Sequence, residues 1–163
     1  MPGTIAIVGR PNVGKSALFN RIAGRRIAIV HDQAGVTRDR ITAEAEWGGR
    51  AFTLVDTGGI GLIPGEKSQD VIATATVEQV DLAIEAADAI IFVVDVQEGI
   101  VPLDEEVAQH LRQSGKPTLL AVNKADHQTA ADNAVEFAAL GFEHIFPVSA
   151  LHDRGTSVLM DTT

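Results

Sequence analysis

The pattern of a phosphate-binding loop, G-x-x-x-x-G-K-S, occurs near the N-terminus in the segment Gly9-Arg10-Pro11-Asn12-Val13-Gly14-Lys15-Ser16. Glycine at positions 9 and 14 permits positive φ angles, which let successive backbone N–H groups turn toward phosphate oxygens. We expect Lys15 to neutralise charge on the β- and γ-phosphates of a nucleotide and the Ser16 hydroxyl to bind Mg²⁺. A glycine turn beside an ordinary surface lysine is the alternative, and the strand-like and helix-like stretches on either side disfavour it.

A second candidate group is Asp56-Thr57-Gly58-Gly59, which follows a hydrophobic stretch. A carboxylate there can reach the Mg²⁺ shell through water, and the Gly59 amide can bond a γ-phosphate. D-x-x-G alone usually marks a turn, but it is informative one hairpin after a phosphate-binding loop. We expect the hydroxyl and backbone of Thr37, in the irregular stretch 31–40, to meet Mg²⁺ and γ-phosphate only in the triphosphate state. Lys15, Thr37 and Gly59 are the expected catalytic set, and Ser16, Thr37 and Asp56 are the expected Mg²⁺ set.

The third candidate group, Asn123-Lys124-Ala125-Asp126, has the chemistry of a guanine-binding motif. The Asp126 carboxylate can accept both N1–H and N2–H₂ of guanine, whereas adenine has no such pair of donors, which disfavours an ATP-using kinase. The Asn123 amide can bond the base and brace the phosphate loop, and the Lys124 stem can lie along the purine. In the segment Ser149-Ala150, the Ala150 amide can donate to guanine O6. The neighbouring residues Val13, Ala17 and Leu151 complete the expected nucleotide contacts.

Short apolar strands alternate with amphipathic stretches, which predicts an α/β fold of the P-loop NTPase class. We expect a doubly wound, mixed but mostly parallel six-stranded sheet with helices on both faces. The predicted strands are residues 4–8, 41–47, 50–55, 89–94, 118–122 and 145–146. Gly48-Gly49 predicts one antiparallel hairpin. The predicted helices are residues 16–22, 73–87, 103–112, 130–140 and one that starts near Gly155, whereas residues 31–40 and 57–69 are expected to be irregular.

Composition limits the functions that this chain can have. Its 163 residues are 45% hydrophobic, contain no cysteine and carry a net charge of −9. Disulfides and thiolate chemistry are therefore excluded, and little direct RNA contact is expected from an acidic domain. The longest apolar stretch, residues 89–94, is too short to cross a bilayer, so we expect a soluble, cytoplasmic protein without a membrane partner.

The order of these motifs resembles that of translation-factor-class GTPases. Gly35-Val36-Thr37-Arg38-Asp39-Arg40 and Asp56-Thr57-Gly58-Gly59-Ile60 narrow the resemblance to the first G domain of the Der (EngA) family of bacterial GTPases, over essentially the whole chain. The resemblance implies binding of GTP and GDP, GTP hydrolysis, and action in assembly of the large ribosomal subunit. It also implies that residues 1–163 are one GTP-binding domain at the N-terminus of a longer protein, with a second G domain and a KH-like domain. The short stretch after Gly155 agrees with a fragment.

Two positions bear on the rate of hydrolysis. Ile60 stands where Ras-type enzymes have a glutamine that orients water, and an isoleucine side chain cannot hydrogen-bond to water. In related potassium-activated GTPases, an asparagine at the position of Asn12 helps to bind K⁺ between the phosphates, and added positive charge stabilises phosphoryl transfer. We therefore expect slow hydrolysis that K⁺ stimulates. The alternative is a non-catalytic module that binds GTP or GDP and regulates partner domains.

Overall fold

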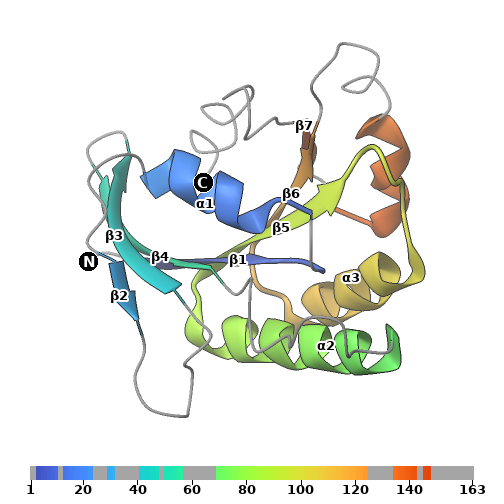
Figure 1. Cartoon of the computed structure of the whole chain (residues 1–163), viewed down its shortest axis with the longest axis horizontal. Coiled ribbons are helices and arrows are strands. Elements are labelled where there is room, and N and C mark those ends of the chain that lie inside the picture. The colour runs from blue at the N-terminus through green and yellow to red at the C-terminus, as the bar shows by residue number, and fades with distance from the viewer. Residues whose placement is uncertain are drawn as a thin grey trace.

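The computed structural model describes residues 3–10, 13–23, 29–31, 41–47, 50–56, 69–124, 134–142 and 145–147. These residues form one seven-stranded sheet in the order β2-β3-β4-β1-β5-β6-β7 (Figure 1). The strands are β1 (Gly3–Val8), β2 (Ile29–His31), β3 (Ile41–Trp47), β4 (Arg50–Asp56), β5 (Ala89–Asp95), β6 (Thr118–Asn123) and β7 (Ile145–Pro147). The helices are α1 (Lys15–Ala23), α2 (Gln69–Ala86), α3 (Pro102–Ser114) and the 3₁₀ helix η1 (Ala134–Leu140).

The sheet is mixed and mostly parallel, as the sequence predicts. β1 lies between β4 and β5 and is parallel to both, and β6 and β7 continue in the same direction. β3 and β4 are antiparallel with Trp47 opposite Arg50, as the hairpin prediction requires, and residues 48–49 lie outside the described residues. A second antiparallel strand, β2, pairs with β3. The sheet therefore has seven strands, where the sequence predicted six. β2 was not predicted because a strand of three residues is too short to show an alternating pattern in the sequence.

Both faces of the sheet are covered, which explains the continuous apolar runs in the central strands. Figure 1 shows α1 on one face and α2 with α3 on the other. Alternate residues of β1 serve the two sides: Ile5 and Ile7 belong to the core beneath α1, and Ala6 and Val8 belong to the core beneath α2 and α3. The prediction of a doubly wound α/β sheet is therefore confirmed.

The buried face of α2 agrees in part with the predicted one. The apolar pattern predicted a stripe at Ala73, Val77, Val80, Ile84 and Ala87. The structure buries Thr76, Val80, Ala83 and Ala87, whereas Val77 and Ile84 are half-buried. Val80 and Ala87 are thus confirmed, and the side chain of Ala73 lies outside the described residues. Thr76 was missed because a hydrophobicity count leaves threonine out.

The helices after β5 and β6 begin and end near the predicted residues. Pro102 begins α3 and Gly115, with a φ of 73°, caps it in the left-handed conformation. The helix predicted at 130–140 is observed as η1 at Ala134–Leu140, and residues 125–133 and the helix predicted near Gly155 lie outside the described residues. Within the described part, no helix combines the length and the apolar character needed to cross a bilayer.

One loop and three polar side chains lie at the same edge of the sheet. β1 ends at Val8 immediately before Gly9, and the parallel strands β4, β5 and β6 end in Asp56, Asp95 and Asn123. Strand register holds these ends level, since Ile7 pairs with Asp56 and Asp95 pairs with Asn123. Ligands of open α/β sheets bind at this carboxyl edge.

Candidate functional site

The phosphate-loop motif lies between β1 and α1, in the strand–turn–helix context that it requires. Gly9 has a φ of 151° and Gly14 a φ of 95°, both in the region that favours glycine. A Cβ at Gly9 would lie 2.5 Å from the carbonyl oxygen of Val93 on β5. The loop therefore depends on these two glycines for its backbone conformation and for its close approach to the sheet.

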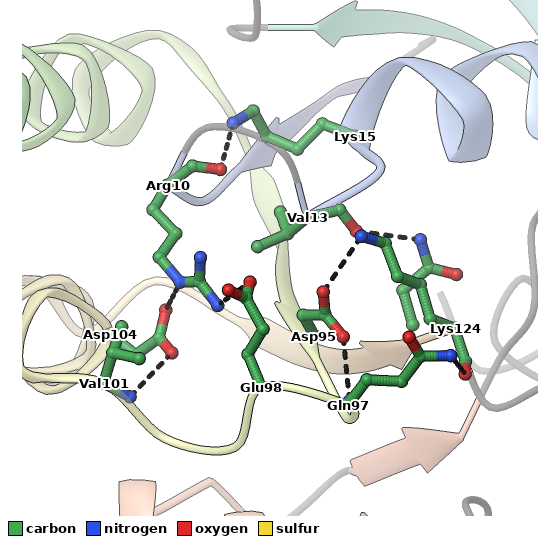
Figure 2. Close-up of polar contacts among 10 residues, drawn as sticks. Arg10, Val13, Lys15, Asp95, Gln97, Glu98, Val101, Asp104 and Lys124 are labelled. Atoms are coloured by element: carbon green, nitrogen blue, oxygen red, sulfur yellow. Dashed lines mark hydrogen bonds and ion pairs between the residues drawn. The ribbon is translucent and has the colours of Figure 1, made fainter.

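Lys15 is buried beneath this loop, with a side chain that turns back on the main chain. Its Nζ donates hydrogen bonds of 2.7 Å to the carbonyl oxygens of Gly9 and Arg10, the second of which is drawn in Figure 2. Burial lowers the pKa of Lys15 to about 8, although the nearby Asp56 carboxylate raises it, and the Arg10 charge lowers it further. A partly desolvated ammonium group at a helix N-terminus is a strong attractant for an anion.

Asp56 ends β4 and is 1% exposed. Its carboxylate is close enough to Lys15 to oppose the fall in the pKa of that lysine. Carboxylate oxygens are the ligands that Mg²⁺ prefers, in sites completed by water and phosphate. A buried carboxylate beside a buried ammonium at the loop therefore fits a magnesium–phosphate group.

Asn123 joins the phosphate loop to the third motif. Its side-chain amide donates a hydrogen bond of 2.9 Å to the carbonyl oxygen of Val13. A Cβ at Gly14 would lie 2.2 Å from the Asn123 amide nitrogen, so this bond requires glycine there. The brace expected of Asn123 is present, and it brings the phosphate and base motifs together.

Lys124 follows β6 with a φ of 65°, the left-handed conformation in a residue other than glycine. Its Nζ lies 2.9 Å from Asp95 Oδ2 in an ion pair with a carboxylate that is almost fully buried. Gln97 adds a backbone donor to Asp95 at 2.8 Å and a side-chain donor to the Lys124 carbonyl at 3.4 Å (Figure 2). The sequence analysis did not predict Asp95 as a site residue. The only feature that indicates it is its position, a carboxylate at the end of a buried strand.

Arg10 points its side chain away from Lys15, toward the start of α3 (Figure 2). Its Nε donates to Asp104 Oδ1 at 3.2 Å, and its Nη2 forms a 2.9 Å ion pair with Glu98 that lacks hydrogen-bond alignment. Asp104 is fully buried and also accepts the Val101 N–H at 3.2 Å. Burial raises the pKa of Asp104, while the Val101 N–H and Arg10 lower it. The sequence suggested only a helix start at this point.

The structure brings together many of the residues predicted to bind nucleotide: Gly9, Val13, Gly14, Lys15, Asp56, Asn123 and Lys124. Ala17 is exposed on α1, and the backbone of Ser16 lies in the first turn of that helix. The other predicted site residues lie outside the described residues: Asn12, Thr37, Gly59, Asp126, Ser149, Ala150 and Leu151.

Comparison with known sequences gives a consistent result. Residues 4–124 match the model of a family described as 50S ribosome-binding GTPase. GTPase Der of Symbiobacterium thermophilum is 54% identical over 161 residues, which are 99% of this chain and 34% of that protein. This likeness confirms the resemblance to a Der G domain that the motifs predicted. The chain spans about a third of the length of the curated relatives it matches.

Solved structures agree with the fold. A variant of Era from Aquifex aeolicus, crystallised with GDP and AlF₄⁻, superposes with a TM-score of 0.75 at 33% identity, covering 98% of this chain and 55% of that one. A structure of Era with MgGDPNP and a 16S ribosomal RNA segment gives a TM-score of 0.72 at 32% identity, with the same coverage.

Proposed function

We propose that this chain, which belongs to the family of 50S ribosome-binding GTPases, is a single GTP-binding domain that hydrolyses GTP to GDP and phosphate and acts as a switch. The observation that carries the proposal is the Asn123–Val13 hydrogen bond. It unites the loop that holds Lys15 with the end of β6, which precedes in sequence the residue we propose for base selection, Asp126, so that one nucleotide would meet both.

The phosphates would lie along the loop from Gly9 to Lys15. The positive φ angles of Gly9 and Gly14 support this role, because they turn backbone N–H groups inward. Lys15 would exchange a main-chain carbonyl partner for phosphate oxygens and neutralise their charge. Ser16, Asp56 and Thr37 would hold Mg²⁺, which, when bound, offsets charge that develops on the β- and γ-phosphates. The MgGDPNP in the Era structure supports this assignment.

The base would be selected at the other end of the brace. Asp126 would accept the two N–H donors of guanine, the Lys124 stem would lie against the purine, and the Ala150 amide would donate to O6 beside Ser149. Val13, Ala17 and Leu151 would provide further contacts with the nucleotide. The ion pair of Lys124 with Asp95 supports a fixed lysine at this point.

Hydrolysis would be slow and stimulated by K⁺. In the reaction, a water oxygen attacks the γ-phosphorus, the bond to the β–γ bridging oxygen breaks, and the water proton leaves with phosphate. Ile60 cannot orient that water, so Lys15, Thr37 and the Gly59 amide would supply the stabilising contacts. Asn12 would help to hold K⁺ beside the phosphates, where added charge lowers the barrier.

The cellular role would be in assembly of the large ribosomal subunit, in the bacterial cytoplasm. The family description and the likeness to Der support this role. The net charge of −9 argues that RNA contacts come mainly from a longer protein that includes a second G domain and a KH-like domain.

Competition binding tests the proposal. A fluorescent GDP should be displaced from the chain by GDP and GTP but not by ADP or ATP. Lys15→Ala should abolish tight binding because it removes the buried cation. A Lys15→Ala chain whose GDP affinity stays within about threefold of wild type would overturn the reading of the phosphate loop.

A further inference from the structure

The segment 95–104, which we call the bridge segment, contacts both halves of the site. It runs from the end of β5 through the connection to the first turn of α3. Figure 2 shows Asp104 and Glu98 against the Arg10 side chain, and Asp95 and Gln97 beside Lys124. None of the sequence motifs includes this segment. Its two fully or almost fully buried carboxylates, Asp95 and Asp104, each hold one cation of the site, Lys124 and Arg10 respectively.

On the phosphate side, Asp104 is linked to Lys15 through Arg10. The Arg10 side chain is held by Asp104 at Nε and by Glu98 at Nη2, and its carbonyl oxygen accepts Lys15 Nζ at 2.7 Å. Glu98 is more than half exposed and contributes little, whereas the contact with Asp104 is buried. The anchored side chain therefore fixes where the Arg10 carbonyl points, and with it the position of Lys15.

On the base side, Asp95 is linked to the base loop through Lys124. One Asp95 oxygen pairs with Lys124 Nζ and the other accepts the Gln97 N–H. The Val96 N–H donates to the Asn123 carbonyl at 3.0 Å, so the backbone is tied at the same point. Lys124 directly follows β6, so these contacts hold the residue whose stem is proposed to lie against the purine.

We propose that Asp95 and Asp104 are positioning residues of the nucleotide site, Asp104 for the phosphates through Arg10 and Asp95 for the guanine base through Lys124. The inference rests on the proposed function. It differs from a purely structural role in what it predicts: lost stability would weaken all nucleotides alike, whereas lost positioning weakens one part of the nucleotide.

The test measures the affinities of GDP, GMP and IDP by displacement of a fluorescent GDP from the full 163-residue chain. The GDP/GMP ratio reports the β-phosphate, and the GDP/IDP ratio reports the guanine 2-amino group, which IDP lacks. The variants are Asp104→Asn and Asp95→Asn. Glu105→Gln is the matched control, since Glu105 is an exposed carboxylate on the first turn of the same helix.

Asp104→Asn should lower the ratio of GDP affinity to GMP affinity about tenfold, which is the size of one charge-assisted hydrogen bond. The ratio of GDP affinity to IDP affinity should stay within about twofold of the wild-type ratio. Asp95→Asn should do the reverse by similar factors. Arg10→Met should reproduce the effect of Asp104→Asn, and the double variant should be no worse than either one, because the two residues act as a unit. Arg10→Met also serves if Asp104→Asn does not fold.

If the Asp95 and Asp104 variants have the same affinity ratios as Glu105→Gln, or lose affinity equally for all three nucleotides, the inference is overturned and the proposed function stands. A wild-type chain that does not bind GDP would overturn both.

Discussion

The side-chain amide of Asn123 donates a hydrogen bond to the carbonyl oxygen of Val13, a residue 110 positions earlier, across a space left open by Gly14. The hydrogen bond requires glycine at position 14, because any Cβ there would overlap the Asn123 amide. A substitution at this glycine should therefore be felt at both ends of the nucleotide site.

Gly14→Ala tests this coupling against Gly115→Ala. Both glycines have positive φ angles, 95° and 73°, but a Cβ at Gly115 meets nothing within 4 Å. Gly115→Ala should lower the free energy of unfolding by about 1–2 kcal/mol, the cost of the left-handed conformation, and leave GDP affinity unchanged. Gly14→Ala should cost more and weaken GDP binding at least about tenfold, as seen by urea unfolding and titration calorimetry. Equal effects of the two changes would contradict the coupling.

Lys15→Met should separate stability from binding in the nucleotide-free chain. Because burial lowers the pKa of Lys15 from 10.5 to about 8, the protonated lysine disfavours the fold, and its contribution to stability rises as the pH increases from about 8 toward 10.5. The gap in stability between wild type and Lys15→Met should therefore change in favour of wild type as the pH rises above about 8.

Urea unfolding without nucleotide between about pH 7 and 9.5 measures this gap. The same variant should lose tight GDP binding. A gap that does not change with pH would show that Lys15 is not desolvated in the fold.

Asp104→Asn should also change how the free energy of unfolding depends on pH. The pKa of Asp104 is raised by burial, so the fold favours the protonated carboxyl, and stability from this group is lost as the pH rises through its folded pKa. The variant should therefore gain stability relative to wild type as the pH rises from about 4 to 7. Glu105→Gln should show no such trend, and a flat difference for Asp104→Asn would argue that Arg10 fully offsets the burial of Asp104.

Asp126→Asn should shift the preference of the chain from GTP toward XTP, because an asparagine amide can donate to the xanthine 2-oxygen where the carboxylate accepts from guanine. Competition by GDP and XDP against a fluorescent nucleotide measures the shift. An unchanged preference would remove Asp126 from base recognition.

The sequence predicted what local patterns encode. The glycines of the phosphate loop, the antiparallel pairing of β3 with β4 and the buried central strands follow from spacing and hydrophobicity, and the structure has them. It did not predict β2, which is three residues long. Nor did it predict Thr76 on the buried face of α2, because a threonine reads as polar.

The carboxylates of the bridge segment were missed for a different reason. Asp104 lies 94 positions from Arg10, and in a helix start a carboxylate ordinarily indicates a cap. Asp95 appears only as the polar end of an apolar run. The partner of a buried charge is set by the fold, so a single sequence shows the charge without its partner.

Multiple-turnover phosphate release with Mg²⁺, from GTP and from ATP, in KCl and in NaCl, measures whether this chain hydrolyses GTP. We predict turnover of GTP alone, slow and faster in KCl than in NaCl. Equal GTP rates in the two salts would contradict the role of Asn12. Absence of GTP turnover in both salts, with GDP still tightly bound, would contradict hydrolysis and favour a non-catalytic switch.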